Sequence, residues 1–203
     1  GLFNECTKLC QIILPQFITK IEDKAFNKCK ALTELIIPSS VTSIGKNTFY
    51  GCESLSHIKI PSSVVSIGDS SFESCSALKE IEFDSNSSLK SIGMKCFNEC
   101  AALIQITIPS LVENIGFSCF KKCSSLQKVE ILSTVLTTIE SYIFFECTSL
   151  KQVNIPSSVT KIESSAFKSC TAMEHIEIPP NLTTVGYSAF ENCSSLKSIS
   201  FPN

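Results

Sequence analysis

The feature that most constrains the fold of this 203-residue chain is a unit of about 23 residues that repeats along its whole length. A cysteine marks each unit, and neighbouring cysteines lie 23 residues apart except for one step of 25 and one of 24: Cys6, Cys29, Cys52, Cys75, Cys100, Cys123, Cys147, Cys170 and Cys193. A phenylalanine stands three residues before every one of them, and leucine or methionine stands three residues after. Self-similarity at such a period predicts stacked coils that share one continuous core.

Each part of the unit indicates its own local structure, and residues 55–68 show the pattern. The apolar residues that follow Leu55 alternate, so Ile58 and Ile60 should point to one face of a short strand. We expect the strands of successive units to pair in parallel about 4.8 Å apart. Pro61 ends the strand because it has no N–H for the ladder. Gly68 suggests a corner with positive φ, and the segment from this glycine to the next cysteine has room for one or two helical turns.

These patterns predict an α/β repeat solenoid of the leucine-rich-repeat kind, a right-handed superhelix. A parallel sheet should form its concave face, and short strands or helical turns its convex side. Residues 1–203 would form one domain of about nine units. The chain begins inside a unit and stops just after a strand, without polar capping segments, so we expect a fragment of a longer array or ends that self-associate end to end.

Two units depart from the common length. The unit after Cys75 has Asp84 in place of proline and two extra residues within 84–88, and the unit after Cys123 has Leu132 in place of proline and one extra residue near 135–136. The core positions resume in register after both. We therefore expect loop bulges on one edge of the solenoid, either harmless insertions or binding decorations.

The full unit, Phe-x-x-Cys-x-x-Leu-x-x-Ile-x-Ile-Pro-x-x-Val-x-x-Ile-Gly, resembles the BspA-type leucine-rich repeat over essentially all of residues 1–203. The Ala-Phe-x-x-Cys signature at residues 25–29, 166–170 and 189–193 carries this resemblance most specifically. The resemblance implies a protein displayed at the cell surface or in the extracellular space. It also implies attachment to host cells or matrix proteins, and it supplies no shared catalytic residues.

The charges and the reactive side chains indicate a binding protein rather than an enzyme. The net charge of −2 is spread over interspersed acids and bases, which argues against a nucleic-acid partner, and no apolar run approaches the roughly 20 residues of a membrane span. His57 and His175 lie five units apart, so they cannot share a metal ion or a proton. We therefore expect no enzymatic activity, no cofactor, no metal site and no insertion into a membrane.

The cysteines are interpreted as buried structural thiols, since one member of each Cys-x-x-x-Cys pair is a core position of the repeat. Cys96 and Cys119 precede the repeat phenylalanine in neighbouring coils, where they could form a disulfide or remain two stacked free thiols. Cys10 occupies a mostly polar position and could be an exposed thiol.

The outward residues of the strands are the candidate partner-binding residues, because solenoids usually bind through such a face. By alternation they are Glu34, Ile36, His57, Lys59, Glu80, Glu82, Gln105, Thr107, Lys128, Glu130, Gln152, Asn154, His175 and Glu177. This mixed polar row suits a protein partner, although a merely solvated strand face has the same composition.

Three hypotheses of function follow. The first is a surface module that adheres to host cells or extracellular-matrix proteins through the concave face. The second is a structural spacer or self-assembling array, and the third is an intracellular scaffold for protein–protein interaction.

Overall fold

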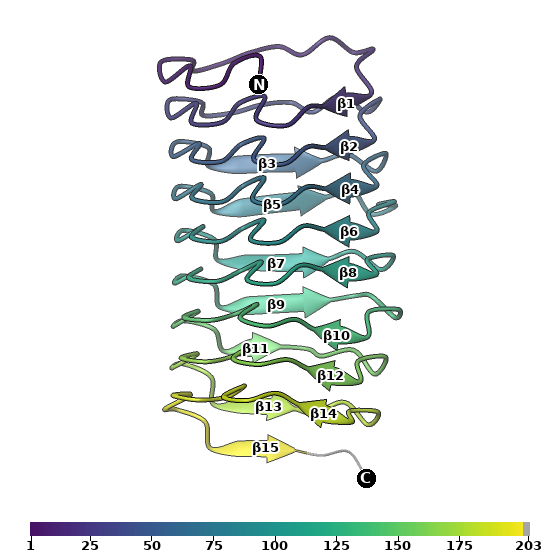
Figure 1. Ribbon diagram of the computed structural model, residues 1–203, viewed down its shortest axis with the longest axis vertical. Coiled ribbons are helices and arrows are strands. Elements are labelled where there is room, and N and C mark those ends of the chain that lie inside the picture. Colours follow the sequence, from purple (N-terminus) through teal and green to yellow (C-terminus); the bar gives the residue numbers. More distant parts are fainter. Residues whose placement is uncertain (201–203) are drawn as a thin grey trace.

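The computed structural model describes residues 1–200 as a parallel β-solenoid of about eight turns, with no helix in that range (Figure 1). Most coils contribute a longer strand, of up to four residues, on one side and a strand of two residues on another. Residues 34–37 form no strand in the structure, although alternation predicted one, and β11 (Gln152–Val153) keeps only two residues of its strand. The longer strands are β3 (His57–Ile60), β5 (Glu80–Phe83), β7 (Gln105–Ile108), β9 (Lys128–Ile131), β11 (Gln152–Val153), β13 (His175–Glu177) and β15 (Ser198–Ser200). The two-residue strands are β1 (Lys20–Ile21), β2 (Ser43–Ile44), β4 (Ser66–Ile67), β6 (Ser91–Ile92), β8 (Asn114–Ile115), β10 (Thr138–Ile139), β12 (Lys161–Ile162) and β14 (Thr184–Val185).

All strand pairs are parallel and join equivalent residues of neighbouring coils, as Ile58 with Ile81 and Ile67 with Ile92. The two-residue strands form one ladder of five, β1-β2-β4-β6-β8, and one of three, β10-β12-β14. The longer strands form three separate ladders, β3-β5, β7-β9-β11 and β13-β15. The predicted parallel sheet is thus confirmed, but it is divided into sections.

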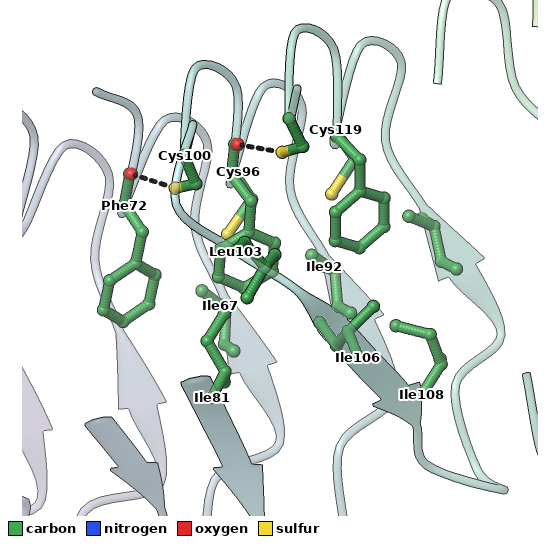
Figure 2. Close-up of a cluster of buried hydrophobic side chains, with 14 of the residues drawn as sticks. Ile67, Phe72, Ile81, Ile92, Cys96, Cys100, Leu103, Ile106, Ile108 and Cys119 are labelled. Atoms are coloured by element: carbon green, nitrogen blue, oxygen red, sulfur yellow. Dashed lines mark hydrogen bonds between the residues drawn. The ribbon is translucent and has the colours of Figure 1, made fainter. Parts of the chain in front are cut away.

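The core is a set of columns that run along the solenoid axis. The repeat phenylalanines from Phe3 to Phe190 form one column, in which neighbouring ring centroids lie 5.1–5.6 Å apart and the ring planes are 3–24° from parallel. Leucine and isoleucine columns lie beside it, and Figure 2 shows part of this packing around Phe72, Leu103 and Ile106. Because each ring needs a neighbour on both faces, one coil alone cannot bury its own apolar side chains.

The repeat cysteines form a column that does more than fill space. The Sγ of Cys100 donates to the carbonyl of Phe72 in the preceding coil at 3.1 Å (Figure 2). The same bond, at 3.0–3.2 Å, joins the repeat cysteine to the phenylalanine of the preceding coil at every step from Cys29 to Cys193. The phenylalanine carbonyl also accepts the amide of the cysteine in its own coil, as Phe97 does from Cys100 at 3.1 Å. Cysteine therefore combines a small apolar side chain with a donor that satisfies a buried carbonyl.

The prediction of helical turns before each cysteine was wrong. Within residues 1–200, sixteen non-glycine residues have φ between 52° and 63°, and they stand two residues before or two residues after the repeat phenylalanine. Positive φ at two residues so close together is incompatible with an α-helix. The amides of Lys95, Phe97 and Glu99 instead donate to Phe117, Cys119 and Lys121 of the next coil at 2.8–2.9 Å. The segment is therefore a chain of turns whose hydrogen bonds run between coils.

The expectation of positive φ at the repeat glycines was also wrong, because Gly51, outside that position, is the only glycine with positive φ in the part of the chain that the structure describes. The glycines after the two-residue strands are required by close approach. A Cβ on Gly68 would lie 2.7 Å from the carbonyl carbon of Gly45, and one on Gly93 would lie 2.5 Å from the amide nitrogen of Asp69. These glycines stack on each other, and a side chain would push the coils apart.

Both irregular loops are held by hydrogen bonds and lie on the edge that follows the longer strands. Asp84 Oδ2 accepts the amide of Ser62 at 3.1 Å, and the amide of Ser88 donates to the carbonyl of Ser62 at 3.0 Å. Ser133 Oγ accepts the amide of Leu136 at 3.0 Å and donates to the carbonyl of Val112. The extra residues are thus absorbed in ordered bulges, and the ladder of two-residue strands breaks beside the second one, between β8 and β10.

Candidate functional site: the long-strand face

The candidate site is the surface formed by the outward side chains of the longer strands and of the equivalent residues in coils where no such strand forms, and we call it the long-strand face. Strand alternation creates it: in β3 the pattern runs exposed His57, buried Ile58, exposed Lys59, buried Ile60. Of the fourteen residues predicted from the sequence, thirteen are exposed and Glu130 is half-buried. Their alignment across coils is direct, since His57 pairs with Glu80 and Thr107 pairs with Glu130 in the strand register.

Ion pairs between neighbouring coils organise the charges of this face. Lys59 Nζ lies 3.1 Å from Glu82 Oε1 and 3.0 Å from Asp84 Oδ1, and His57 Nδ1 lies 3.6 Å from Glu80 Oε2. Hydrogen bonds to Asp84 and Glu82 raise the pKa of Lys59, and the bond from Lys59 lowers the pKa of Asp84. Asp84 was not among the predicted site residues, although its place in an irregular loop directly after a strand was a usable signal.

The long-strand face is more acidic than the chain as a whole. Five of its fourteen residues are glutamates and two are lysines, so its formal charge is −3, against −2 for all 203 residues. The remaining surface is therefore close to neutral. A partner with a basic surface would be favoured here over an acidic one.

Two breaks in the ladder of longer strands coincide with hollows in the face. A hollow of about 350 Å³ lies between β5 and β7 and is lined by Glu80, Glu82, Gln105 and Thr107 together with the loop 84–87. A second hollow, of about 790 Å³, lies across β11 and β13, where it includes Gln152, Asn154, His175 and Glu177. Each hollow brings side chains of two or three coils to one place.

Asn154 is less available to a partner than alternation suggested. Its Oδ1 accepts the amide of Ile131 at 2.6 Å and its Nδ2 donates to the carbonyl of Ile131 at 3.0 Å. The side chain thus bonds to the neighbouring strand just beyond the point where β11 ends. Alternation cannot reveal this, because the bond depends on where the neighbouring coil lies.

Other reactive groups stay apart. His57 faces Glu80. His175 lies five coils further along the array, and its Nδ1 is 2.8 Å from Ser198 Oγ. Within residues 1–200, no group of three or more histidine, cysteine or acidic side chains is placed to hold a metal ion. Cys96 and Cys119 are buried free thiols, and burial raises the pKa of both. Cys10 is exposed, as its polar repeat position suggested.

Among the members of the face that sequence reasoning missed is Ile13. Ile13 is 93% exposed and stands 23 residues before Ile36, which is 82% exposed. The repeat spacing was sufficient to find it. Together these two residues form the apolar end of an otherwise polar row.

Comparison with known proteins agrees with this architecture. The family model described as the BspA type leucine rich repeat region matches residues 1–110 and 90–203, with six copies. No curated protein matches the chain significantly.

Several solved structures share the fold. A leucine-rich cell surface protein of Faecalibacterium prausnitzii A2-165 is 29% identical with a TM-score of 0.60, over 99% of this chain and 62% of the other. A leucine-rich repeat protein of T. pallidum is 27% identical with a TM-score of 0.68, over 93% of this chain and 78% of the other. One of Bacteroides ovatus ATCC 8483 is 30% identical with a TM-score of 0.61, over 92% and 59%. The chain thus spans about three-fifths of the length of the first and third of these proteins.

The stacked coils, the parallel ladders and the exposed strand face define a leucine-rich-repeat solenoid, a class of protein that typically serves as a binding scaffold rather than an enzyme. More specifically, the chain belongs to the BspA-type leucine-rich repeat family, as the Ala-Phe-x-x-Cys signature had indicated. In the part of the chain that the structure describes, there is no helix with the length and apolar character needed to cross a membrane.

Proposed function

We propose that this chain is the protein-binding module of a surface-displayed protein, and that it adheres to a host-cell or extracellular-matrix protein through the long-strand face. The observation that carries the proposal is the contrast between the two sides of each strand. Inward positions are apolar in every coil, whereas outward positions change from coil to coil in charge and size. The apolar inward positions satisfy packing, so the varied outward positions are free to provide recognition.

Two further observations support it. The hollows at the ladder breaks bring outward residues of several coils together. Such concave surfaces can receive the side chains of a partner. The relative from Faecalibacterium prausnitzii is described as a cell surface protein.

The test is binding of the purified chain, by surface interferometry, to a panel of matrix proteins and to whole epithelial cells. We expect saturable binding that becomes at least tenfold weaker in the double variant Glu80→Ala/Glu82→Ala, because both carboxylates line the hollow between β5 and β7.

A matched control removes two exposed, ion-paired glutamates elsewhere, in the double variant Glu99→Ala/Glu113→Ala. These residues pair with Lys122 and Lys90 and lie off the long-strand face. The net charge changes equally in the two double variants. Equal loss of binding in both would show a general charge effect and contradict a site on this face.

A further inference from the structure

One end of the long-strand face carries an apolar pair that packing does not explain. Ile13 and Ile36 occupy the central outward position of neighbouring coils and are 93% and 82% exposed. Leu35 and Ile37, which flank Ile36 in the chain, are buried. In the following coils the position is polar throughout, being held by Lys59, Glu82, Thr107, Glu130, Asn154 and Glu177. The exposure of Ile36 does not come from a missing neighbour, because the coils on both sides of it are present.

Hollows lie on both sides of Ile36. One, of about 330 Å³, is lined by Ile13, Ile36, Gln11 and Glu34. The other, of about 590 Å³, is lined by Ile36 and Glu34 together with His57 and other residues of the next coil. Ile36 is therefore a ridge between two depressions, so an apolar side chain seated in either one would cover it.

The charges around this pair select the partner's chemistry. Glu34 accepts a hydrogen bond from Gln11 Nε2 at 2.9 Å. Among residues 1–200 it takes part in no ion pair. Lys59, the lysine that borders the second hollow, is already held by Glu82 and Asp84. An unneutralised carboxylate thus lies directly beside an exposed apolar pair, on a face whose formal charge is negative.

We propose that Ile13, Ile36 and Glu34 form a docking site for a protein segment that carries an aliphatic or aromatic side chain next to a lysine or arginine. The apolar side chain covers the two isoleucines, and the cation pairs with Glu34. An acidic segment is repelled by Glu34, and a basic segment without the apolar group leaves the isoleucines exposed. This inference rests on the proposed function and names the partner chemistry for one part of the same face.

The test uses three synthetic decapeptides of equal length as probes: alternating Leu and Lys, alternating Leu and Glu, and alternating Ser and Lys. Binding is followed on the intact chain by fluorescence polarisation and by the isoleucine δ1-methyl NMR signals, assigned with Ile13→Ser and Ile36→Ser. We expect the Leu/Lys peptide to bind at least tenfold more tightly than the other two and to shift the methyl signals of Ile13 and Ile36. Ile36→Ser and Glu34→Gln should each weaken it at least fivefold.

The control variant is Leu111→Ser, which also removes an exposed apolar side chain but lies outside the long-strand face, in the loop after β7. Its affinity should match that of the unaltered chain, and circular dichroism checks that each variant is folded. Equal binding of the Ser/Lys peptide would reduce the effect to charge attraction and overturn the inference.

Two other outcomes also overturn it. If no peptide binds while a matrix protein or cell surface does, this docking site is wrong but the proposed function stands. If light scattering shows an oligomer that Ile36→Ser disperses, the occupant is a second copy of this chain rather than a basic partner segment.

Discussion

At the scale of single residues, the turn segment depends on backbone conformations that most side chains disfavour. Residues two before and two after the repeat phenylalanine adopt positive φ, and lysine, serine and glutamate occupy most of these positions instead of glycine. A left-handed conformation costs a non-glycine residue roughly 1–2 kcal/mol. The conformation persists because it directs alternate amides at the carbonyls of the next coil.

Lys95 offers a direct measurement of that cost, since it is exposed and has φ of 53°. We expect Lys95→Gly to raise the free energy of unfolding by about 0.5–1 kcal/mol, because relief of the left-handed strain exceeds the entropy that glycine loses on folding. Lys95→Val should lower it, since a β-branched side chain tolerates positive φ least. Urea denaturation measures both changes. A destabilised glycine variant would contradict this account of the turn.

A second residue-scale prediction separates close approach from backbone conformation. Gly93→Ala should lower the free energy of unfolding by about 1–3 kcal/mol or more, because its Cβ would lie 2.5 Å from the amide nitrogen of Asp69. Gly51 has φ of +66°, but its Cβ would meet nothing closer than 3.6 Å. Gly51→Ala should therefore cost only about 1 kcal/mol. Equal costs in thermal or urea unfolding would show that the glycine column is not steric in origin.

At the scale of elements, the solenoid is held together by columns and ladders that join each coil to the next. The cysteine column illustrates the arrangement, because each thiol is buried beside another and donates to the phenylalanine carbonyl of the preceding coil. Burial raises the pKa of Cys52 and of Cys123 from 9.0 to about 12, and the pKa of Cys75 and Cys100 is also raised. The folded column therefore keeps its protons at a pH where an unfolded chain would lose them.

The expected consequence is a loss of stability in alkali. Because the pKa values are raised in the folded state, the contribution of these thiols is complete below pH 9 and declines as the pH rises from about 9 toward 12. Each thiol should contribute about 1.4 kcal/mol of loss per pH unit in that range. The measurement is the free energy of unfolding in urea between pH 8 and 10.5 for the unaltered chain and for Cys52→Ala.

The slope of the variant relative to the unaltered chain is the informative quantity, because the difference between the two isolates the contribution of Cys52. The variant is expected to be less stable at pH 8 but less dependent on pH above 9. Identical slopes for the two proteins would mean that Cys52 does not remain protonated in the folded state.

At the scale of the whole molecule, the chain is a linear array in which each coil contacts only its neighbours. The stability of a coil therefore depends on how many neighbours it has, and opening should begin where neighbours are fewest. The cysteines report on this directly, since at least one occurs in each coil. Cys6 and Cys10 are exposed, Cys193 is half-buried, and the other nine are buried.

We expect alkylation by iodoacetamide, followed by mass spectrometry, to proceed in a defined order. Cys6 and Cys10 should react first, then Cys193, and the central Cys96, Cys100, Cys119 and Cys123 last. The central thiols need an opening of several coils, and their raised pKa values also disfavour the reactive thiolate. Simultaneous modification of all twelve would indicate that the array opens as a single unit. An absence of free thiol at Cys96 and Cys119 would show that these two form a disulfide.

The amino-acid sequence by itself determined the period, the identity of the inward positions and the place of the longer strands from β3 onward. Residues 57–60 and 105–108 alternate as they do because a strand has only two faces and one of them must be apolar. The family followed from the same repeat and was confirmed by the match over the whole chain. The role of the long-strand face in binding remains a prediction.

Only the tertiary structure decided how one coil meets the next. It replaced the expected helical turns by residues of positive φ such as Lys95, because the hydrogen bonds of that segment run between coils. It also showed that residue 93 must be glycine because a Cβ there would collide with the backbone of the preceding coil. The ladder of longer strands is divided into sections, and the hollows lie beside the breaks. The same geometry determines that Lys59 pairs with Asp84 and that, among the described residues, no cation pairs with Glu34. A periodic sequence specifies what each coil must bury, but the distance and register between coils come from packing along the whole array.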